Sequence, residues 1–462
     1  MKPLTKRRQD YVFGNTLQVT PVTRNQICGV ETRLVEIEQI VDRMKNFRML
    51  QKAGVDIGGG ALLYGPAGVG KTYFARYIAT TTKEYARFVD MRSFPRRKSD
   101  AEEALTPEDV RKLFALTEAF VKEKRKPIIL LYDEFQDAGE DIIAELRVQL
   151  CGIRRRENGI YLLLLSTEEL ENSDEQLFRP GRVSDHIVFA PPSLRGKTEI
   201  LAYHVGHRPH DPTIDFESIA FLFENEATPA FIAKLVEDAH SEACIEAGKM
   251  NAIIEERHLL HHAILALTGP AVEEYLNEAG RYMAAIHESG HAIFAHFLKI
   301  PIRIITILPQ IRSSLHGGVG TVPPPEMLMS VETIEKLLVF RLGGMTAEKI
   351  FGFSNLLTSE NDLADIMNCV STMVERLGCG QETRRQYGCF VASREKSEYS
   401  DTLRRRLESD TARILKRAEK KAEELVRYIG KRKMKKYIQT VTEMLLKKNI
   451  ILRKEFQQIF ET

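Results

Sequence analysis

A glycine-rich octapeptide that follows a short apolar run places the strongest constraint on how this chain can fold. Residues 61–64 (ALLY) lead directly into residues 65–72 (GPAGVGKT). In a G-x-x-x-x-G-K-T loop between a strand and a helix, backbone N–H groups point at phosphate oxygens and the helix N-terminus adds positive potential. The apolar run predicts the strand, and a helical pattern over residues 73–79 predicts the helix. We therefore expect an α/β domain with a nucleotide site. The residues of its loop are Gly65, Pro66, Ala67, Gly68, Val69, Gly70, Lys71 and Thr72.

Two carboxylates complete the predicted nucleotide site. Within the loop, Lys71 is expected to reach the β- and γ-phosphates, and Thr72 is expected to bind Mg²⁺. A second apolar run, residues 128–132, ends in Asp133 and Glu134. At this point in an ATPase, the first carboxylate holds the Mg²⁺ shell and the second orients or deprotonates the attacking water. The predicted ligands are thus ATP and Mg²⁺.

A third apolar run, residues 160–165, supports a parallel sheet, because short apolar runs separated by helical patterns are typical of sheets covered by helices. Residues 178–182 (FRPGR) follow this run. Arg179 and Arg182 are either ordinary surface charge or, in a ring-forming ATPase, side chains that stabilise the γ-phosphate in a neighbouring subunit. Their spacing alone leaves both interpretations open.

A second motif, residues 287–291 (HESGH), predicts a zinc site. Histidines four residues apart, here His287 and His291, lie on one face of a helix and can bind one Zn²⁺. Glu288 can take a proton from the attacking water and deliver it to the leaving amine. A catalytic zinc needs a third protein ligand. By residue type the candidates for this ligand are many and include Glu348, Glu360, Asp362 and Asp365, among which spacing alone cannot choose.

Composition excludes several classes of protein. The 462 residues include 66 basic and 64 acidic side chains, and this net charge of +2 does not favour nucleic-acid binding by bulk charge. No stretch approaches the ~18 apolar residues of a membrane span, and the N-terminus lacks the apolar core of a secretory signal. The six cysteines form no C-x-x-C pair. We expect a cytoplasmic or organelle-matrix protein with reduced thiols, with peripheral recruitment to a membrane by partners as the alternative.

Breaks in the sequence pattern predict four segments. They are a polar tail (1–26), the α/β nucleotide-binding domain (27–192), a helical lid (193–268) and a helical zinc peptidase domain (269–462). Within the last two we expect helices at 214–222, 229–247 and 255–267, and one strand-like segment at 302–308. The highly charged run after residue 400 is expected to be a helix with a solvated face, and an RNA-binding arm is the alternative.

An ATPase loop followed in the same chain by an H-E-x-x-H helix resembles the FtsH family of ATP-dependent zinc metalloproteases. The resemblance extends from about residue 26 to the C-terminus. Residues 179–182 (RPGR) are similar to the family's arginine-finger segment, and residues 342–348 (LGGMTAE) to its GG-x-x-AE segment. Residues 358–363 (TSENDL) are similar to the stretch that supplies the third zinc ligand.

The resemblance implies a fold and a set of site residues. The fold is an α/β P-loop (AAA+) ATPase with a helical lid, followed by a mostly α-helical zinc metalloprotease domain. Asp362 is implied as the third zinc ligand, and Arg179 and Arg182 as arginine fingers. Glu348 either orients a zinc ligand or is a carboxylate on a helix surface. The residues implied to lie near the adenine are Ile27, Cys28 and His204.

This sequence departs from the family pattern at four places, one of which is a shortened lid stretch at residues 230–233 (AFIA). The family's ATPase domain usually follows a transmembrane anchor, and no such segment is expected here. Glu168 stands where the family has an Asn at the end of the third strand. Residues 96–109 lack the aromatic residue of the family's pore loop, and Phe94 is the nearest.

The resemblance implies a homo-hexameric, ATP-dependent zinc endopeptidase that translocates unfolded or damaged polypeptides and cleaves them, as in protein quality control. Two alternatives remain open at this point. One is a zinc peptidase with a weakened, scaffold-like ATPase, which the changes at Glu168 and in the pore loop would suit. The other is an ATP-dependent chaperone with little proteolysis.

Overall fold

The computed structural model describes residues 20–29, 31–55, 59–93, 105–151, 159–166, 176–178, 182–223, 227–269, 277–308, 318–321, 330–353, 360–376 and 401–461. Contacts between Cα atoms divide the chain into two compact units, residues 1–260 and 261–462. The predicted boundary between lid and peptidase, after residue 268, stays a prediction. Among the described helices, none combines the length and apolar character that a membrane crossing needs.

Five parallel strands form the core of the first unit, in the order β2-β3-β4-β1-β5. The three predicted apolar runs are its three central strands, β1 (Gly59–Tyr64), β3 (Ile128–Tyr132) and β4 (Ile160–Ser166). The edge strands β2 (Arg87–Asp90) and β5 (Val183–Val188) are found only in the structure. β5 alternates buried and exposed residues, so its sequence carries no apolar run.

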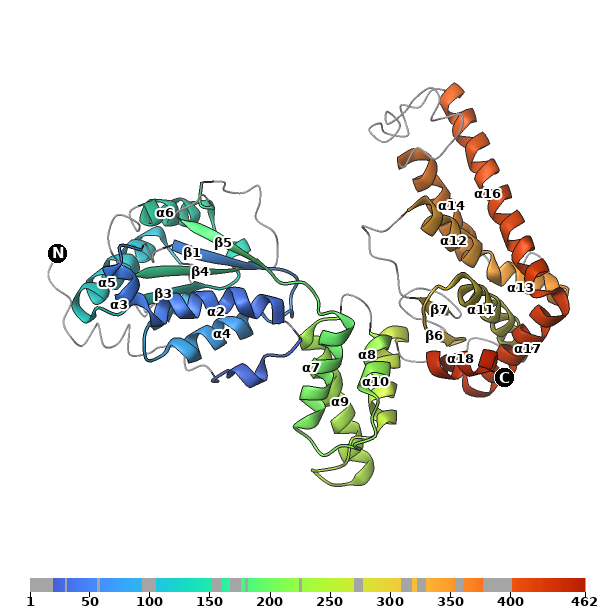
Figure 1. The fold of residues 1–462 in the computed structure, drawn as a ribbon, viewed down its shortest axis with the longest axis horizontal. Helices are drawn as coiled ribbons and strands as arrows, with labels where there is room; N and C mark the ends of the chain where they lie inside the picture. Colours follow the sequence, from blue (N-terminus) through green and yellow to red (C-terminus); the bar gives the residue numbers. More distant parts are fainter. Residues whose placement is uncertain are drawn as a thin grey trace. The chain divides into compact units, whose positions relative to one another are not determined.

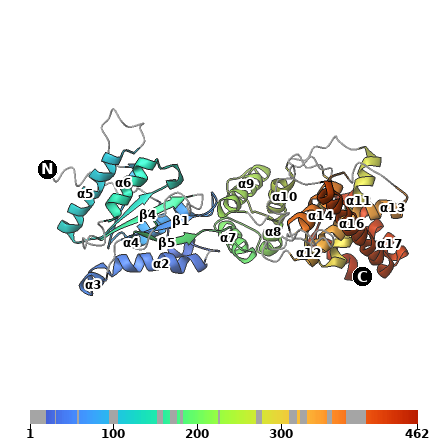
Figure 2. The ribbon, with the colours of Figure 1, turned by 90° about the horizontal axis from the view of Figure 1, so that it is seen from above.

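Helices cover both faces of this sheet (Figures 1 and 2). α2 (Glu31–Lys45) and α4 (Lys71–Thr82) lie on one face, and α5 (Pro107–Lys124) and α6 (Glu140–Cys151) lie on the other. Their buried apolar residues form one core with the strands. The smaller elements are η1 (Arg24–Gln26), α3 (Phe47–Lys52), η2 (Met91–Ser93) and η3 (Phe135–Asp137). Because all strands are parallel, the loops that follow β1 and β3 leave the same edge of the sheet.

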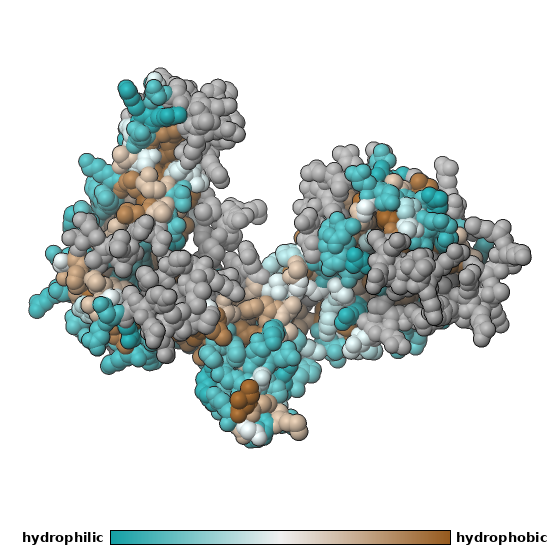
Figure 3. Space-filling model, turned by 180° about the vertical axis from the view of Figure 1, so that it is seen from behind, coloured by the Kyte–Doolittle hydropathy of each residue, from teal (hydrophilic) through white to brown (hydrophobic). Residues whose placement is uncertain are grey.

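A helical region follows the sheet, as predicted. It consists of α7 (Leu194–Gly206), α8 (Phe216–Leu222), α9 (Pro229–Ala247) and α10 (Glu256–Thr268). Three of these helices begin at a side-chain cap, in which Ser193, Asp215 and Thr228 each accept a hydrogen bond from a backbone N–H of the first turn. The surface of this region is mostly hydrophilic, with a small hydrophobic area at its tip (Figure 3).

The second unit is built around α11 (Glu278–Leu298), against which α13 (Gly343–Phe351) and α17 (Lys431–Lys448) pack. The predicted strand near residue 302 is confirmed as β6 (Ile302–Thr306), but it is not a lone strand. It pairs antiparallel with β7 (Gly318–Thr321) and β8 (Ile450–Leu452). The other elements are α12 (Val331–Arg341), α14 (Glu360–Ser371), the π-helix η6 (Thr372–Arg376), α16 (Asp401–Ile429) and α18 (Arg453–Glu461).

The charged C-terminal run is helical, as predicted, but only partly solvated. α17 buries four apolar side chains in the core of the second unit: Met434, Ile438, Val441 and Leu445. Its cationic residues, such as Lys431 and Lys435, are exposed. One face of this helix is therefore part of the peptidase core.

Candidate nucleotide site and metal centre

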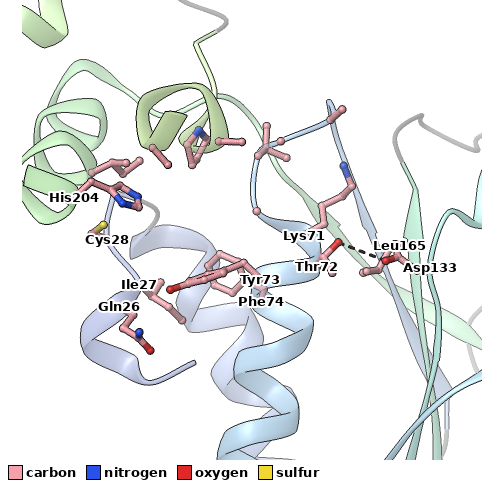
Figure 4. Close-up of a pocket in the computed structure, with 18 of the residues that line it drawn as sticks. Gln26, Ile27, Cys28, Lys71, Thr72, Tyr73, Phe74, Asp133, Leu165 and His204 are labelled. Atoms are coloured by element: carbon pink, nitrogen blue, oxygen red, sulfur yellow. Dashed lines mark hydrogen bonds between the residues drawn. The ribbon is translucent and has the colours of Figure 1, made fainter. Parts of the chain in front are cut away.

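A pocket of about 400 Å³ lies in the first unit beside the glycine-rich loop (Figure 4). Ile27, Cys28 and His204 lie at one end of this pocket, and Lys71, Thr72 and Asp133 lie at the other. The predicted residues that line it are Ile27, Cys28, Ala67, Gly68, Val69, Gly70, Lys71, Thr72, Asp133, Glu134 and His204. The structure thus brings together most of the predicted nucleotide site from segments far apart in the sequence.

The loop conformation depends on its glycines. Gly65, Gly68 and Gly70 have φ angles of +146°, +79° and +101°, in the range that L side chains rarely adopt. A Cβ atom at Gly65 would also lie 1.9 Å from the carbonyl oxygen of Phe189. α4 begins directly after the loop, at Lys71, so the N-terminal N–H groups of this helix face the pocket end that carries Thr72.

Lys71 is buried and folded back onto the loop. Its Nζ donates hydrogen bonds to the carbonyl oxygens of Gly65 at 2.6 Å and Pro66 at 2.8 Å. Burial lowers the pKa of Lys71, while Glu134 and Asp133 oppose that effect. The hydroxyl of Thr72 lies 3.5 Å from a carboxylate oxygen of Asp133. A hydroxyl and a carboxylate at this separation fit a shared Mg²⁺.

At the other end of the pocket, the segment with Ile27 and Cys28 is held against α7. The backbone N–H of Gly29 donates to Glu199 at 3.2 Å, and a Cβ at Gly29 would lie 2.6 Å from the carbonyl oxygen of Gly196. Burial, followed by Arg208 and His207, lowers the pKa of His204, so its ring is neutral near pH 7. Burial and the charge of Glu199 raise the pKa of Cys28 to about 11.

One contact at this site was not predicted. The backbone N–H of Ala230, at the start of α9, donates to the carbonyl oxygen of Gly68 at 3.2 Å. A Cβ at Gly68 would meet the hydroxyl of Thr228 at 2.9 Å. The lid and the phosphate-binding loop are therefore in direct contact. Because Gly68 and Ala230 are brought together only by the tertiary structure, their contact could not be predicted from the sequence pattern.

The remaining predictions for the ATPase fall partly outside the described residues. Arg179, Glu168, Phe94 and the first part of the pore-loop segment lie outside them. Arg182 precedes β5, and its guanidinium donates to the carbonyl oxygen of Gln176. It is not among the described residues that line the pocket of its own chain.

In the second unit, two histidines of α11 meet an aspartate of α14. His287 Nε2 lies 2.9 Å and His291 Nε2 lies 2.8 Å from the same oxygen of Asp362, Oδ2. The two Nε2 atoms are 3.0 Å apart. All three side chains are buried. Of the named third-ligand candidates whose side chains are described, Asp362 joins the Nε2 atoms of both histidines, whereas Glu348 contacts the opposite ring nitrogen of His287 and Asp365 pairs with Arg341.

The hydrogen bonds on the far side of both imidazole rings orient them for binding a cation. Nδ1 of His287 lies 2.7 Å from the carboxylate of Glu348, and Nδ1 of His291 lies 3.0 Å from the carbonyl oxygen of Phe340. Both partners accept, so each Nδ1 donates its proton to them and each Nε2 is the ring nitrogen left for a metal. Two ring nitrogens and one carboxylate oxygen converge within 3.0 Å of one another. Two imidazoles and a carboxylate are a donor set that zinc prefers.

The electrostatics of this cluster favour positive charge between the three side chains. Burial opposes the charged form of His287, but hydrogen bonds with Asp362 and Glu348 outweigh it and raise the pKa of His287 to about 10. Burial also raises the pKa of Asp362, but the hydrogen bonds from His287 and His291 hold it well below its usual range. Glu288 is buried beside them, and its burial raises its pKa.

Glycines allow α13 to pack closely on the histidine helix. A Cβ at Gly290 would lie 2.3 Å from the carbonyl oxygen of Gly343, and a Cβ at Gly344 would lie 2.4 Å from the ring of His287. This packing places Glu348, on the same helix, behind His287. Glu348 is 2% exposed, so of its two interpretations the structure supports the one in which it orients a ligand.

Comparison with known proteins agrees with both sites. Residues 61–191 match the family model of the ATPase family associated with various cellular activities (AAA), and residues 274–459 match that of peptidase family M41. The ATP-dependent zinc metalloprotease FtsH of Kosmotoga olearia is 27% identical over 466 residues, which cover 95% of this chain and 69% of the relative. The chain belongs to the FtsH family.

Further FtsH relatives show the same extent of similarity. The ATP-dependent zinc metalloprotease FtsH of Thermobaculum terrenum is 27% identical over 87% of this chain and 64% of its own length. The ATP-dependent zinc metalloprotease FtsH 1 of Petrotoga mobilis is 26% identical over 95% of this chain and 68% of its own length. The chain thus spans about two thirds of the length of these FtsH proteins.

The predicted fold class is confirmed: an AAA domain with a parallel sheet is followed by a helical M41 peptidase region. An FtsH-family chain with both domains is an ATP-dependent metalloendopeptidase, with ATP, Mg²⁺ and Zn²⁺ as its ligands.

Proposed function

We propose that this FtsH-family chain hydrolyses ATP to translocate unfolded or damaged polypeptides and cleaves them at the metal centre. The observation that carries the proposal is the complete cluster of His287, His291 and Asp362 in a chain that also holds a phosphate-binding loop beside Asp133 and Glu134. The relatives named as ATP-dependent zinc metalloproteases support it. They do not favour either alternative, the scaffold-like ATPase or the chaperone with little proteolysis.

At the metal centre, His287, His291 and Asp362 would hold Zn²⁺. Bound zinc supplies a Lewis acid that polarises a peptide carbonyl and lowers the pKa of water. Glu288 would accept a proton from the attacking water as the C–O bond forms, and would donate it to the amine as the C–N bond breaks. Burial raises the pKa of Glu288, which makes its carboxylate a stronger proton acceptor. Glu348 would keep the ring of His287 in place throughout.

At the nucleotide site, Lys71 would exchange its contacts with the carbonyl oxygens of Gly65 and Pro66 for the β- and γ-phosphates. Thr72 and Asp133 would share the Mg²⁺ shell, and Glu134 would orient the attacking water. Ile27, Cys28 and His204 would surround the adenine.

We infer that Arg179 and Arg182 act on the nucleotide of a neighbouring subunit in a homo-hexameric ring. Arg182 lies outside the pocket of its own chain, which fits a role in a second copy. Exposed apolar residues near the end of α9, including Ile245, Met250 and Ile253, offer surface for subunit contacts. Sedimentation with and without ATP tests the ring: a monomer under both conditions would contradict it.

The location that we propose is the cytoplasm or an organelle matrix or stroma, with peripheral recruitment to a membrane by partners as the alternative. Cysteine usage supports a reducing compartment, since Cys28, Cys244 and Cys369 are free thiols. Cell fractionation with and without a salt wash separates the two possibilities.

Degradation of casein, an unfolded protein, tests the proposed function. Glu288→Gln keeps the shape of the side chain but removes the proton acceptor, so we expect cleavage to fall about 10²- to 10⁴-fold, while ATP hydrolysis continues. Glu332→Gln, which changes an exposed glutamate on α12, is the matched control and should degrade casein normally. Equal degradation by Glu288→Gln and the wild type would contradict the proposed peptidase mechanism.

A further inference from the structure

Arg341, the last residue of α12, forms ion pairs with Asp362 of the candidate metal centre and with Asp365. Its Nη1 lies 3.5 Å from Oδ1 of Asp362, and its Nη2 lies 2.9 Å from Oδ2 of Asp365. The guanidinium also lies over the ring of Phe340, 5.8 Å from the ring centroid. Its side chain is half-exposed, at 41%, whereas that of Asp362 is 8% exposed.

The two oxygens of Asp362 therefore have different partners. Oδ2 faces both imidazoles, at 2.9 and 2.8 Å, while Oδ1 faces Arg341. A carboxylate can bind a metal through one oxygen or through both. If both oxygens bound, the second would compete for the position that a catalytic metal keeps open for water.

We propose that Arg341 is a positioning residue that holds Oδ1 of Asp362 away from the metal, so that Asp362 binds through Oδ2 alone. This inference rests on the proposed function, because it assumes that Asp362 is a metal ligand. Its consequence is that one coordination position stays available for the attacking water.

The last turn of α12 has the geometry for this task. The carbonyl oxygen of Phe340 accepts from Nδ1 of His291 at 3.0 Å, and the next residue, Arg341, holds Asp362. Two consecutive residues of one helix thus orient two of the three ligands. The planar fork of an arginine can contact two carboxylates at once, whereas a lysine is a single point charge. Arg341 links Asp362 to Asp365, which is one turn later on α14.

Cobalt substitution tests the proposal with the full chain. Co²⁺ is titrated into metal-free wild type, Arg341→Gln, Arg341→Lys, Asp365→Asn and a matched control, Lys336→Gln. Lys336 forms an exposed ion pair with Glu332 on the same helix. Optical d–d absorption reports the coordination number, and casein cleavage by the zinc forms gives kcat and KM.

We expect Arg341→Gln to bind Co²⁺ with the weaker d–d absorption of a higher coordination number. Its kcat should fall about 10- to 100-fold, the usual effect of losing a partner of a metal ligand, with KM nearly unchanged. Arg341→Lys should not restore the wild-type spectrum, and Lys336→Gln should have that spectrum. A wild-type spectrum or an unchanged kcat in Arg341→Gln would overturn the proposal.

Two further outcomes are informative. If Arg341→Gln does not fold, as judged by circular dichroism, the Asp365→Asn variant decides the question. This variant keeps Arg341 but removes the charge of its second partner. A wild-type Co²⁺ spectrum in Asp365→Asn would then overturn the proposal. If the wild type itself binds no Co²⁺, the proposed metal centre fails, which is a different result from a failure of Arg341 alone.

Discussion

At the scale of single residues, Glu348 orients His287, one of the proposed metal ligands. Glu348 lies 2.7 Å from Nδ1 of His287, and both side chains are buried. It therefore fixes which nitrogen of the ring carries the proton, and with it the lone pair that faces the metal. No solvent molecule would replace this partner easily, because α13 packs directly on the ring.

We predict that Glu348→Leu weakens zinc binding about 10- to 100-fold. Glu348→Gln should lose less, because an amide oxygen can still accept from Nδ1. Competition with a coloured chelator measures the affinity, and Glu332→Gln is the exposed control. Unchanged affinity in Glu348→Leu would show that this carboxylate does not orient the ligand.

Cys28 gives a second prediction at this scale. Its pKa of about 11 lies above the ordinary value of 9.0, so the raised pKa keeps the thiol protonated at pH 8. Thiolate is the reactive form, and its population at pH 8 is then about 100-fold lower than for an ordinary thiol. Iodoacetamide should modify Cys28 slowly at pH 8 and faster as the pH rises towards 11. Peptide mass spectrometry follows this residue alone, and rapid modification at pH 8 would contradict the described environment.

At the scale of elements, the contact between α11 and α13 positions the proposed zinc ligands. Gly290 lies inside α11, where alanine would ordinarily stabilise the helix by about 1 kcal/mol. Here a Cβ would lie 2.3 Å from the carbonyl oxygen of Gly343 and 2.6 Å from the Cβ of Ala347. Such overpacking costs about 1–3 kcal/mol.

We therefore predict that Gly290→Ala lowers the thermal midpoint of the peptidase unit, by about 2–4 °C for each kcal/mol, and also weakens zinc binding. Gly206→Ala is the matched control, because Gly206 ends α7 and a Cβ there meets nothing within 4 Å. Circular dichroism on heating measures both variants. A higher thermal midpoint for Gly290→Ala would contradict the prediction, because it would show that α11 and α13 can move apart to make room for the added methyl group.

Elements with a local sequence signal were predictable, and those that depend on distant partners were not. β1, β3 and β4 are apolar runs because both faces of these strands are buried. β8 has only three residues and exists through pairing with β6, more than a hundred residues earlier. α17 looked solvated because its many charges hide the spacing of Met434, Ile438, Val441 and Leu445.

The same distinction applies to the sites. The two motifs, residues 65–72 and 287–291, each lie within one segment and carry their chemistry in their spacing. Asp362 is 71 residues from His291, so spacing left it among many candidates and only the family resemblance selected it. Arg341 and the contact of Ala230 with Gly68 carry no local pattern at all.

At the scale of the whole molecule, we propose that two chemical centres in one chain act on the same substrate. The nucleotide site lies in the unit of residues 1–260, and the metal centre lies in the unit of residues 261–462. A folded substrate separates their roles, because it must be unfolded before its peptide bonds can reach a buried metal. Casein needs no such step.

The most direct measurement of this claim is the degradation of a stably folded fluorescent protein with ATP, followed by loss of fluorescence and by release of peptides. The wild type should produce both signals. Glu134→Gln should bind ATP but hydrolyse it slowly, and should produce neither signal while still cleaving casein. Glu288→Gln should lose peptide release even though ATP hydrolysis continues. Full degradation of the folded protein by Glu134→Gln would contradict the claim that ATP hydrolysis unfolds the substrate before it is cleaved.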